Sequence, residues 1–170
     1  MGYQPDFSTV DGLIHALYQS IGFPPGGRPD WNLFREIALP DAHLIRVGSP
    51  DRDGNDCLRV ETFIDLSTDF LAQSQLRERG FEEIEIMRHT ESFGRIAHIF
   101  STYESRFFGE DRSFARGTNS IQLMKKDGRW WLVSILWDEE GQGRVIDDKY
   151  LPRQRNTQEI KTISLDEDPQ

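Results

Sequence analysis

The sequence predicts an α+β fold in which helices come first and an antiparallel sheet follows. Three observations carry this prediction. Apolar residues recur at helical spacing in the first part of the chain, and after residue 80 four segments rich in β-branched and aromatic residues are separated by turn residues. A third observation is Asp127-Gly128, a strong signal for a two-residue hairpin turn. Helices followed by a run of antiparallel strands is an α+β pattern.

The first helix is predicted to begin after Ser8, which resembles the first residue of a capping box, with Asp11 in place of the usual Glu. The apolar residues of this helix form one face: Val10, Leu13, Ile14, Leu17, Tyr18 and Ile21. Gly22 and the Pro- and Gly-rich segment 24–27 end it.

Two more helices are predicted before the main sheet. Asp30 caps a short helix that ends before Pro40. A longer helix covers residues 63–79 and ends at Gly80. Its apolar face is predicted to hold Phe63, Phe70 and Leu71.

Five strands are predicted. The first is the segment 43–47, followed by a polar loop over residues 49–56, and the others are 81–89, 95–107, 114–125 and 129–138. The expected organisation is one domain over residues 1–152 with a polar tail over residues 153–170.

The composition of the chain argues against several classes of function. The chain has 170 residues and a net charge of −9, and it lacks a long basic patch, so we expect no binding to nucleic acid. The single cysteine, Cys57, forms no internal disulfide, and no signal peptide is visible, which favours a reducing, cytoplasmic location. The longest apolar stretch, residues 130–137, is too short to span a membrane.

Several segments resemble one known family. Residues 93–105 (FGRIAHIFSTYES) and 116–123 (RGTNSIQL), with 127–131 and 134–138 behind them, are similar to segments of uncharacterised bacterial members of the nuclear transport factor 2-like (SnoaL-like) superfamily. The resemblance implies a cystatin-like cone, in which a curved antiparallel sheet has the N-terminal helices packed on its concave face. It also implies a pocket in the cone for a small apolar molecule, and a homodimer formed through the convex face.

The Asp127-Gly128 turn predicts which side chains share a face of the last hairpin. A simple hairpin pairs Lys126 with Arg129, and each step outward keeps that pairing. With Tyr18 from the first helix, the predicted ligand-binding residues are Thr118, Ser120, Gln122, Val133, Ile135 and Trp137. The alternative is that both faces of this hairpin are ordinary core and dimer interface.

A catalytic centre is less defined. The ketosteroid isomerases of this superfamily use a carboxylate base and acidic hydrogen-bond donors, but Ser120 and the strand 43–47 place no acid where the resemblance would put them. Dehydratases and cyclases pair a His with an Asp, and His98 is the candidate histidine here. The loop that starts at Asp51 resembles a calcium-binding loop but has Asp56 where that loop needs Gly. We therefore expect no metal and no cofactor.

Three functions remain open after these observations. The first is a small-molecule-binding domain with an apolar pocket in the cone. The second is an isomerase, dehydratase or cyclase that works by acid–base catalysis without a cofactor. The third is a dimerisation module.

Overall fold

The computed structural model describes residues 4–48 and 56–153. Helices and strands follow one another in the order α1 (Val10–Ile21), α2 (Trp31–Ile37), β1 (Ala38–Arg46), β2 (Cys57–Arg59), α3 (Val60–Gln73), α4 (Leu76–Arg79), β3 (Glu82–Phe93), β4 (Ile96–Arg106), β5 (Ser113–Lys126) and β6 (Arg129–Glu139). A 3₁₀ turn, η1 (Asp148–Tyr150), follows the last strand.

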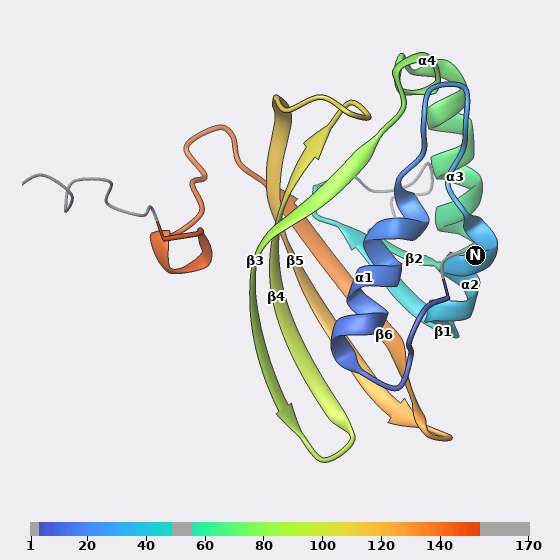
Figure 1. Cartoon of the computed structure of the whole chain (residues 1–170), viewed down its shortest axis with the longest axis vertical. Helices are drawn as coiled ribbons and strands as arrows, with labels where there is room; N and C mark the ends of the chain where they lie inside the picture. Colours follow the sequence, from blue (N-terminus) through green and yellow to red (C-terminus); the bar gives the residue numbers. More distant parts are fainter. Residues whose placement is uncertain (1–3, 49–55, 154–170) are drawn as a thin grey trace, which may run out of the picture.

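All six strands form one curved sheet in the order β2-β1-β6-β5-β4-β3 (Figure 1). Neighbouring strands run antiparallel, except that β1 and β6 are parallel. The helix-first α+β fold predicted from the sequence is confirmed.

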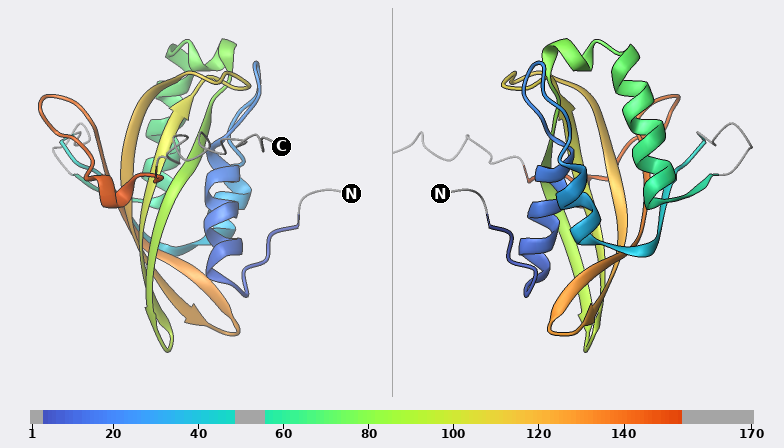
Figure 2. Two further views of the ribbon diagram at one scale, coloured as in Figure 1. Left: turned by 60° about the vertical axis from the view of Figure 1, so that its left-hand side comes forward. Right: turned by 90° about the vertical axis from the view of Figure 1, so that its right-hand side faces the viewer.

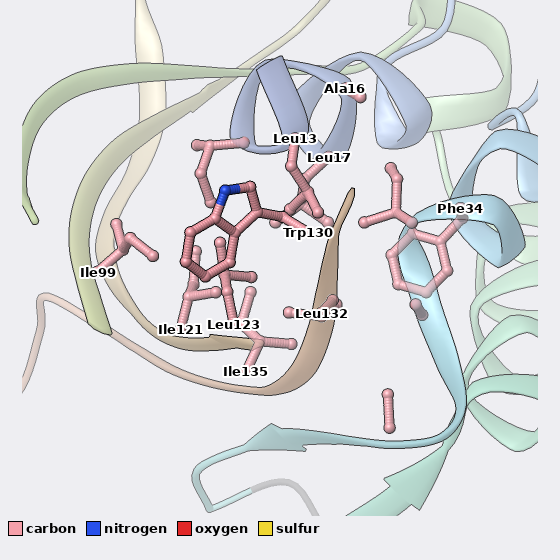
Figure 3. Close-up of a cluster of buried hydrophobic side chains, with 14 of the residues drawn as sticks. Leu13, Ala16, Leu17, Phe34, Ile99, Ile121, Leu123, Trp130, Leu132 and Ile135 are labelled. Atoms are coloured by element: carbon pink, nitrogen blue, oxygen red, sulfur yellow. The ribbon is translucent and has the colours of Figure 1, made fainter. Parts of the chain in front are cut away.

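The helices lie on the concave face of the sheet (Figures 1 and 2). Helix α1 packs against β3 and β6, α2 against β1 and β6, and α3 against β1 and β2. Figure 3 shows the core that forms between α1 and the sheet, where the labelled side chains include Leu13, Leu17, Ile121, Trp130 and Leu132. Burying an aliphatic or aromatic side chain of this kind contributes about 1.5–3 kcal/mol, so the sheet needs α1 to cover this face.

The helix boundaries follow the predictions with two corrections. Thr9, not Ser8, is the N-cap of α1, and its hydroxyl accepts the Gly12 N–H at 3.0 Å. Asp30 caps α2 as predicted, accepting the Leu33 N–H at 3.0 Å.

The second correction concerns the helix predicted over residues 63–79, which is divided into α3 and α4. The chain leaves the helix at Ser74, whose backbone is extended (φ −102°, ψ 156°). Phe70, predicted on the apolar face, is 63% exposed, because α3 is buried only near its start, at Val60 and Ile64. Gly80 ends α4 with a φ of 72°, a conformation that favours glycine.

The Asp127-Gly128 turn is confirmed, but the predicted register fails beyond it. Both residues have positive φ, 53° and 77°, as a primed hairpin turn requires. The pairing matches the prediction from Lys126–Arg129 as far as Met124–Trp131. The register then shifts by one residue at Val133, so Gln122 pairs with Ser134 rather than with Val133. One extra residue in a strand moves every later side chain to the other face.

The convex face of the sheet is crossed by the segment after β6 (Figure 1). The Tyr150 ring packs on Phe100 with centroids 4.6 Å apart, and His89 Nε2 lies 2.9 Å from the Lys149 carbonyl oxygen. The predicted tail beyond residue 153 and most of the predicted polar loop, including Asp51, lie outside the described residues. In the part of the chain that the structure describes, no helix is long and apolar enough to cross a membrane.

Candidate functional site

The shift at Val133 divides the predicted ligand-binding residues between the two faces of the sheet. Ile135 and Trp137 pair with Ile121 and Asn119 on the concave face, where Tyr18 also lies. The hydroxyl and amide residues of the prediction belong to the opposite, convex face: Thr118, Ser120 and Gln122. The prediction that they share one face with Trp137 is therefore wrong, because the hairpin is not a simple one.

His98 belongs to the convex face. Its Nδ1 is hydrogen-bonded to the side-chain amide of Gln122, its cross-strand neighbour. Dehydratases and cyclases of this superfamily pair a His with an Asp. His98 is paired with the amide of Gln122 instead.

A line of polar side chains crosses the concave face. The Asn119 Nδ2 donates to Tyr18 Oη at 3.0 Å, and Tyr18 Oη lies 2.7 Å from Ser101 Oγ. Ser101 Oγ in turn donates to a carboxylate oxygen of Glu85. Ser101 points its one hydroxyl proton at Glu85, so its oxygen accepts the hydrogen bond from Tyr18 Oη. Tyr18 Oη in turn accepts from Asn119. Every hydrogen bond in the line therefore points toward Glu85.

Glu85, the last residue of this line, is held in place by an ion pair with Arg88. Arg88 holds Glu85 with contacts as short as 2.6 Å and reaches Asp11 on α1 at 2.5 Å. Burial is the main cause that raises the pKa of Tyr18 above its ordinary value, so Tyr18 remains a neutral hydrogen-bond donor at physiological pH.

Glu83 is the most perturbed carboxyl on the concave face. It is hydrogen-bonded to Ser105, its partner across β3 and β4. Burial, reinforced by the nearby charge of Glu139, raises the pKa of Glu83 to about 8. Glu83 therefore carries its proton at neutral pH. The residue still has part of its surface exposed to solvent.

Tyr103 lies in one row with Gly117 and Glu139 across β4, β5 and β6. Its ring covers Gly117 closely, since a Cβ added at Gly117 would lie 2.5 Å from the Tyr103 hydroxyl. That hydroxyl is buried and has no hydrogen-bond partner among the described residues. Burial, with the charges of Glu83 and Glu139 next, raises the pKa of Tyr103 above its ordinary value.

We call the residues Tyr18, Glu83, Ser101, Tyr103 and Asn119 the concave polar cluster. Glu139 lies at one side of this cluster, and its side chain is 35% exposed and lies 3.6 Å from the Arg46 guanidinium. Phe63 and Trp137, which meet edge to face at 5.9 Å, are also partly exposed. Polar groups beside partly exposed aromatic rings are the composition of a ligand site.

Two cavities lie outside the concave polar cluster. One, of about 380 Å³, lies on the convex face between the sheet and the segment that leads to Tyr150, and Thr118 and Ser120 line it. It also reaches Trp137 and Glu139 at the end of β6. The other, of about 660 Å³, lies between the α1–α2 loop and α3. A buried hydroxyl without a partner among the described residues occurs on both faces, Tyr103 on the concave one and Thr102 on the convex one. We assign the chemistry to the concave polar cluster because the strongest pKa shifts are found there.

The sequence missed Glu83, Tyr103 and Glu139. Residues 82–86 read Glu-Glu-Ile-Glu-Ile, a pattern that normally places the isoleucines inside. Here Glu83 and Glu85 face the concave side, and Ile84 is 37% exposed on the other. The one available signal was the small residue Gly117 within a strand, which often marks a close approach by a neighbouring group.

Comparison with known proteins supports the fold and leaves the function open. No protein-family model matches the chain, and no curated protein matches it. Among solved structures it is similar to a nuclear transport factor 2-like protein of unknown function from Pseudomonas putida (8% identity, 78% of this chain and 84% of that one, TM-score 0.57).

It is also similar to a cystatin-like protein of unknown function from Nostoc punctiforme (12% identity, 66% and 78% covered, TM-score 0.54). A third similar structure is a candidate ketosteroid isomerase from Parabacteroides distasonis (13% identity, 78% and 88% covered, TM-score 0.52). The fold class is thus a helix-covered curved sheet. The chain has the nuclear transport factor 2-like, cystatin-like fold that its sequence segments predicted.

Proposed function

We propose that this chain binds a small, mostly apolar molecule on the concave face of the sheet, at the side of the concave polar cluster where Glu139, Phe63 and Trp137 lie. The observation that carries the proposal is the Tyr103 hydroxyl, which is buried and unpartnered beside a protonated Glu83. An unpartnered buried hydroxyl costs about 1–3 kcal/mol, and a ligand oxygen that accepts a hydrogen bond from it would recover that cost. The rings of Phe63 and Trp137 supply the apolar wall.

A titration with a neutral apolar dye that carries a carbonyl group, such as Nile red, tests the proposal. Tyr103→Phe keeps the ring and removes only the hydroxyl, so we expect the dye to bind about fivefold more weakly, the loss of one hydrogen bond. Ser120→Ala is the matched control because it removes a hydroxyl from the convex face. If Ser120→Ala weakens binding and Tyr103→Phe does not, the ligand site is on the convex face and the proposal fails.

A second function, acid–base catalysis without a cofactor, is favoured by Glu83. A carboxyl with a pKa of about 8 is poised to take up and return a proton near neutral pH. In the reaction class that this suggests, the Glu83 carboxylate removes a proton from a carbon next to a carbonyl group. The Tyr103 hydroxyl donates a hydrogen bond to the enolate oxygen, and Glu83 then returns the proton. The similarity to a candidate ketosteroid isomerase supports this class only at the level of the fold.

Hydrogen–deuterium exchange next to the carbonyl of a panel of cyclic ketones, followed by NMR, tests this second function. The protein should accelerate exchange in some member of the panel, and the rate should rise with pH up to about pH 8, as Glu83 ionises. Glu83→Gln should reduce the acceleration roughly 10²- to 10⁴-fold. Glu78→Gln, an exposed carboxylate on α4, should leave it unchanged. Equal rates in the wild type and Glu83→Gln would exclude this role for Glu83.

A further inference from the structure

The larger of the two cavities described above is separate from the concave polar cluster. It has a volume of about 660 Å³, and its lining residues come from the loop that joins α1 to α2, from α2, from α3 and from α4. This volume is in the range of sites for small organic ligands. Apolar side chains line part of it: Phe23, Pro29, Trp31 and Leu71.

The wall formed by the loop is held in place by backbone hydrogen bonds. The Gly26 N–H donates to the Arg77 carbonyl of α4 at 2.9 Å, and the Asp30 N–H donates to the Ser20 carbonyl of α1 at 2.8 Å. Gly26 has a φ of 73°, so the turn favours a glycine there. The cavity is therefore a formed feature of the fold, bounded by loop and helices that are tied together.

Three arginines line this cavity, and two of them have no acidic partner. Arg35 is neutralised by Glu61 through two hydrogen bonds of 2.7 and 2.8 Å. Among residues 4–48 and 56–153, the guanidinium groups of Arg28 and Arg77 make neither an ion pair nor a hydrogen bond. The one carboxylate in the lining, Asp30, accepts the Leu33 N–H as the cap of α2.

Arg28 and Arg77 are exposed, and they border a cavity whose lining is partly polar and partly apolar. A guanidinium without an acidic partner is a strong donor to carboxylate and phosphate groups. Two of them beside apolar side chains match a molecule with an anionic group on an apolar body. We infer that this cavity binds a small organic anion, an apolar carboxylate or sulfonate, at a site distinct from the concave polar cluster. Arg28 and Arg77 contact its charged group, and Trp31 and Leu71 contact its body.

Anilinonaphthalene sulfonate, an apolar aryl sulfonate, is a suitable fluorescent probe for the wild-type chain. We expect saturable binding that weakens as salt is added, because the contacts are between charges. Octanoate should displace the probe, whereas octanol, with the same chain length and no charge, should not. Equal displacement by both compounds would mean that the site selects only for apolar surface, and would overturn the inference.

The double substitution Arg28→Gln and Arg77→Gln locates the site. It should weaken probe binding at least roughly tenfold, the loss expected for two charge-assisted contacts. Arg95→Gln and Arg112→Gln form the matched control, since they remove the same charge from exposed residues outside this cavity. An equal loss in both double variants would mean that net charge alone governs binding, which would contradict a site at Arg28 and Arg77.

Filling the cavity gives an independent test. Ala72 lines it and is exposed, so Ala72→Trp should block the probe without disturbing the core. Amide NMR shifts on adding octanoate should concentrate at residues 26–32 and 68–77. Shifts confined to Glu83 and Tyr103 would place the anion on the concave face and overturn the inference. The proposal that a neutral ligand binds on the concave face would be unaffected by that result.

Discussion

Glu83 shows how one side chain can couple folding to pH. Its carboxyl is protonated in the folded chain up to about pH 8 and ionises near its ordinary value, 4.5, once the chain unfolds. The unfolded state therefore binds fewer protons than the folded state between these values, and the free energy of unfolding falls as pH rises through this window. The predicted slope from this residue is up to about 1.4 kcal/mol per pH unit, and partial exposure reduces it.

Urea denaturation at several values between pH 5 and pH 8 measures this slope. Glu83→Gln has no ionisable group, so it should flatten the slope and be more stable than the wild type at pH 8. Glu78→Gln is the control, because Glu78 is exposed and should leave the slope unchanged. A wild-type slope that persists in Glu83→Gln would show that other groups cause it.

Trp137 gives a second prediction at this scale. It lies on the concave face and meets Phe63 edge to face at 5.9 Å, but it is only partly buried. A fully packed Trp→Ala change costs about 3–5 kcal/mol, and a partly exposed wall residue should cost less because fewer neighbours lose contacts. Trp137→Ala should therefore weaken Nile red binding more than it weakens folding. Full core-like destabilisation with unchanged dye binding would show that Trp137 is ordinary packing.

Sequence reasoning identified some concave residues and missed others for a physical reason. Tyr18 was found because helical spacing on α1 fixes which side chains face the sheet. Glu83 and Tyr103 were missed because an alternating strand has two faces and the sequence does not say which one the helices cover. Their pKa values depend on neighbours, such as Glu139, that are far away along the chain.

At the scale of the elements, the β5–β6 hairpin shows where sequence reasoning holds and where it stops. Asp127-Gly128 correctly predicted the turn and the first pairs, since turn chemistry is local. The extra residue at Val133 has no local signature, because a bulge is selected by the curvature of the whole sheet. The effect of this extra residue is large, because it places Ile135 and Trp137 on the concave face while Ser120 stays on the convex face.

Gly117 carries a prediction at this scale. An added Cβ would lie 2.5 Å from the Tyr103 hydroxyl and 2.6 Å from the Asp138 carbonyl oxygen, so the sheet itself would have to shift. Gly117→Ala should destabilise the chain by about 1–3 kcal/mol. Chemical denaturation measures this loss. Gly117→Ala with Tyr103→Phe should recover only the part caused by the hydroxyl, because the ring carbon Cζ at position 103 would still lie 2.7 Å from the added Cβ. No recovery would place the strain at this ring carbon and at the Asp138 carbonyl oxygen.

For the whole molecule, the arrangement of layers leaves one face of the sheet without helices. Helices α1, α2 and α3 all pack on the concave side, and η1 covers part of the convex side through Tyr150. The order of helices and strands made this layering predictable. The path of the chain after β6 was not, because residues 140–147 have no periodic pattern.

The uncovered apolar side chains of the convex face predict a homodimer. Val47, Ile84 and Leu136 are 51%, 37% and 38% exposed there, and a second copy would bury them. Light scattering at micromolar concentration should return twice the mass of one chain. Leu136→Glu should return a single-chain mass, because it places a charge in the predicted interface, while its partly exposed position spares the core. Phe70→Glu, an exposed apolar residue on α3, should remain dimeric. A wild-type mass of one chain, or a dimer that persists in Leu136→Glu, would mean that the convex face meets solvent rather than a second copy.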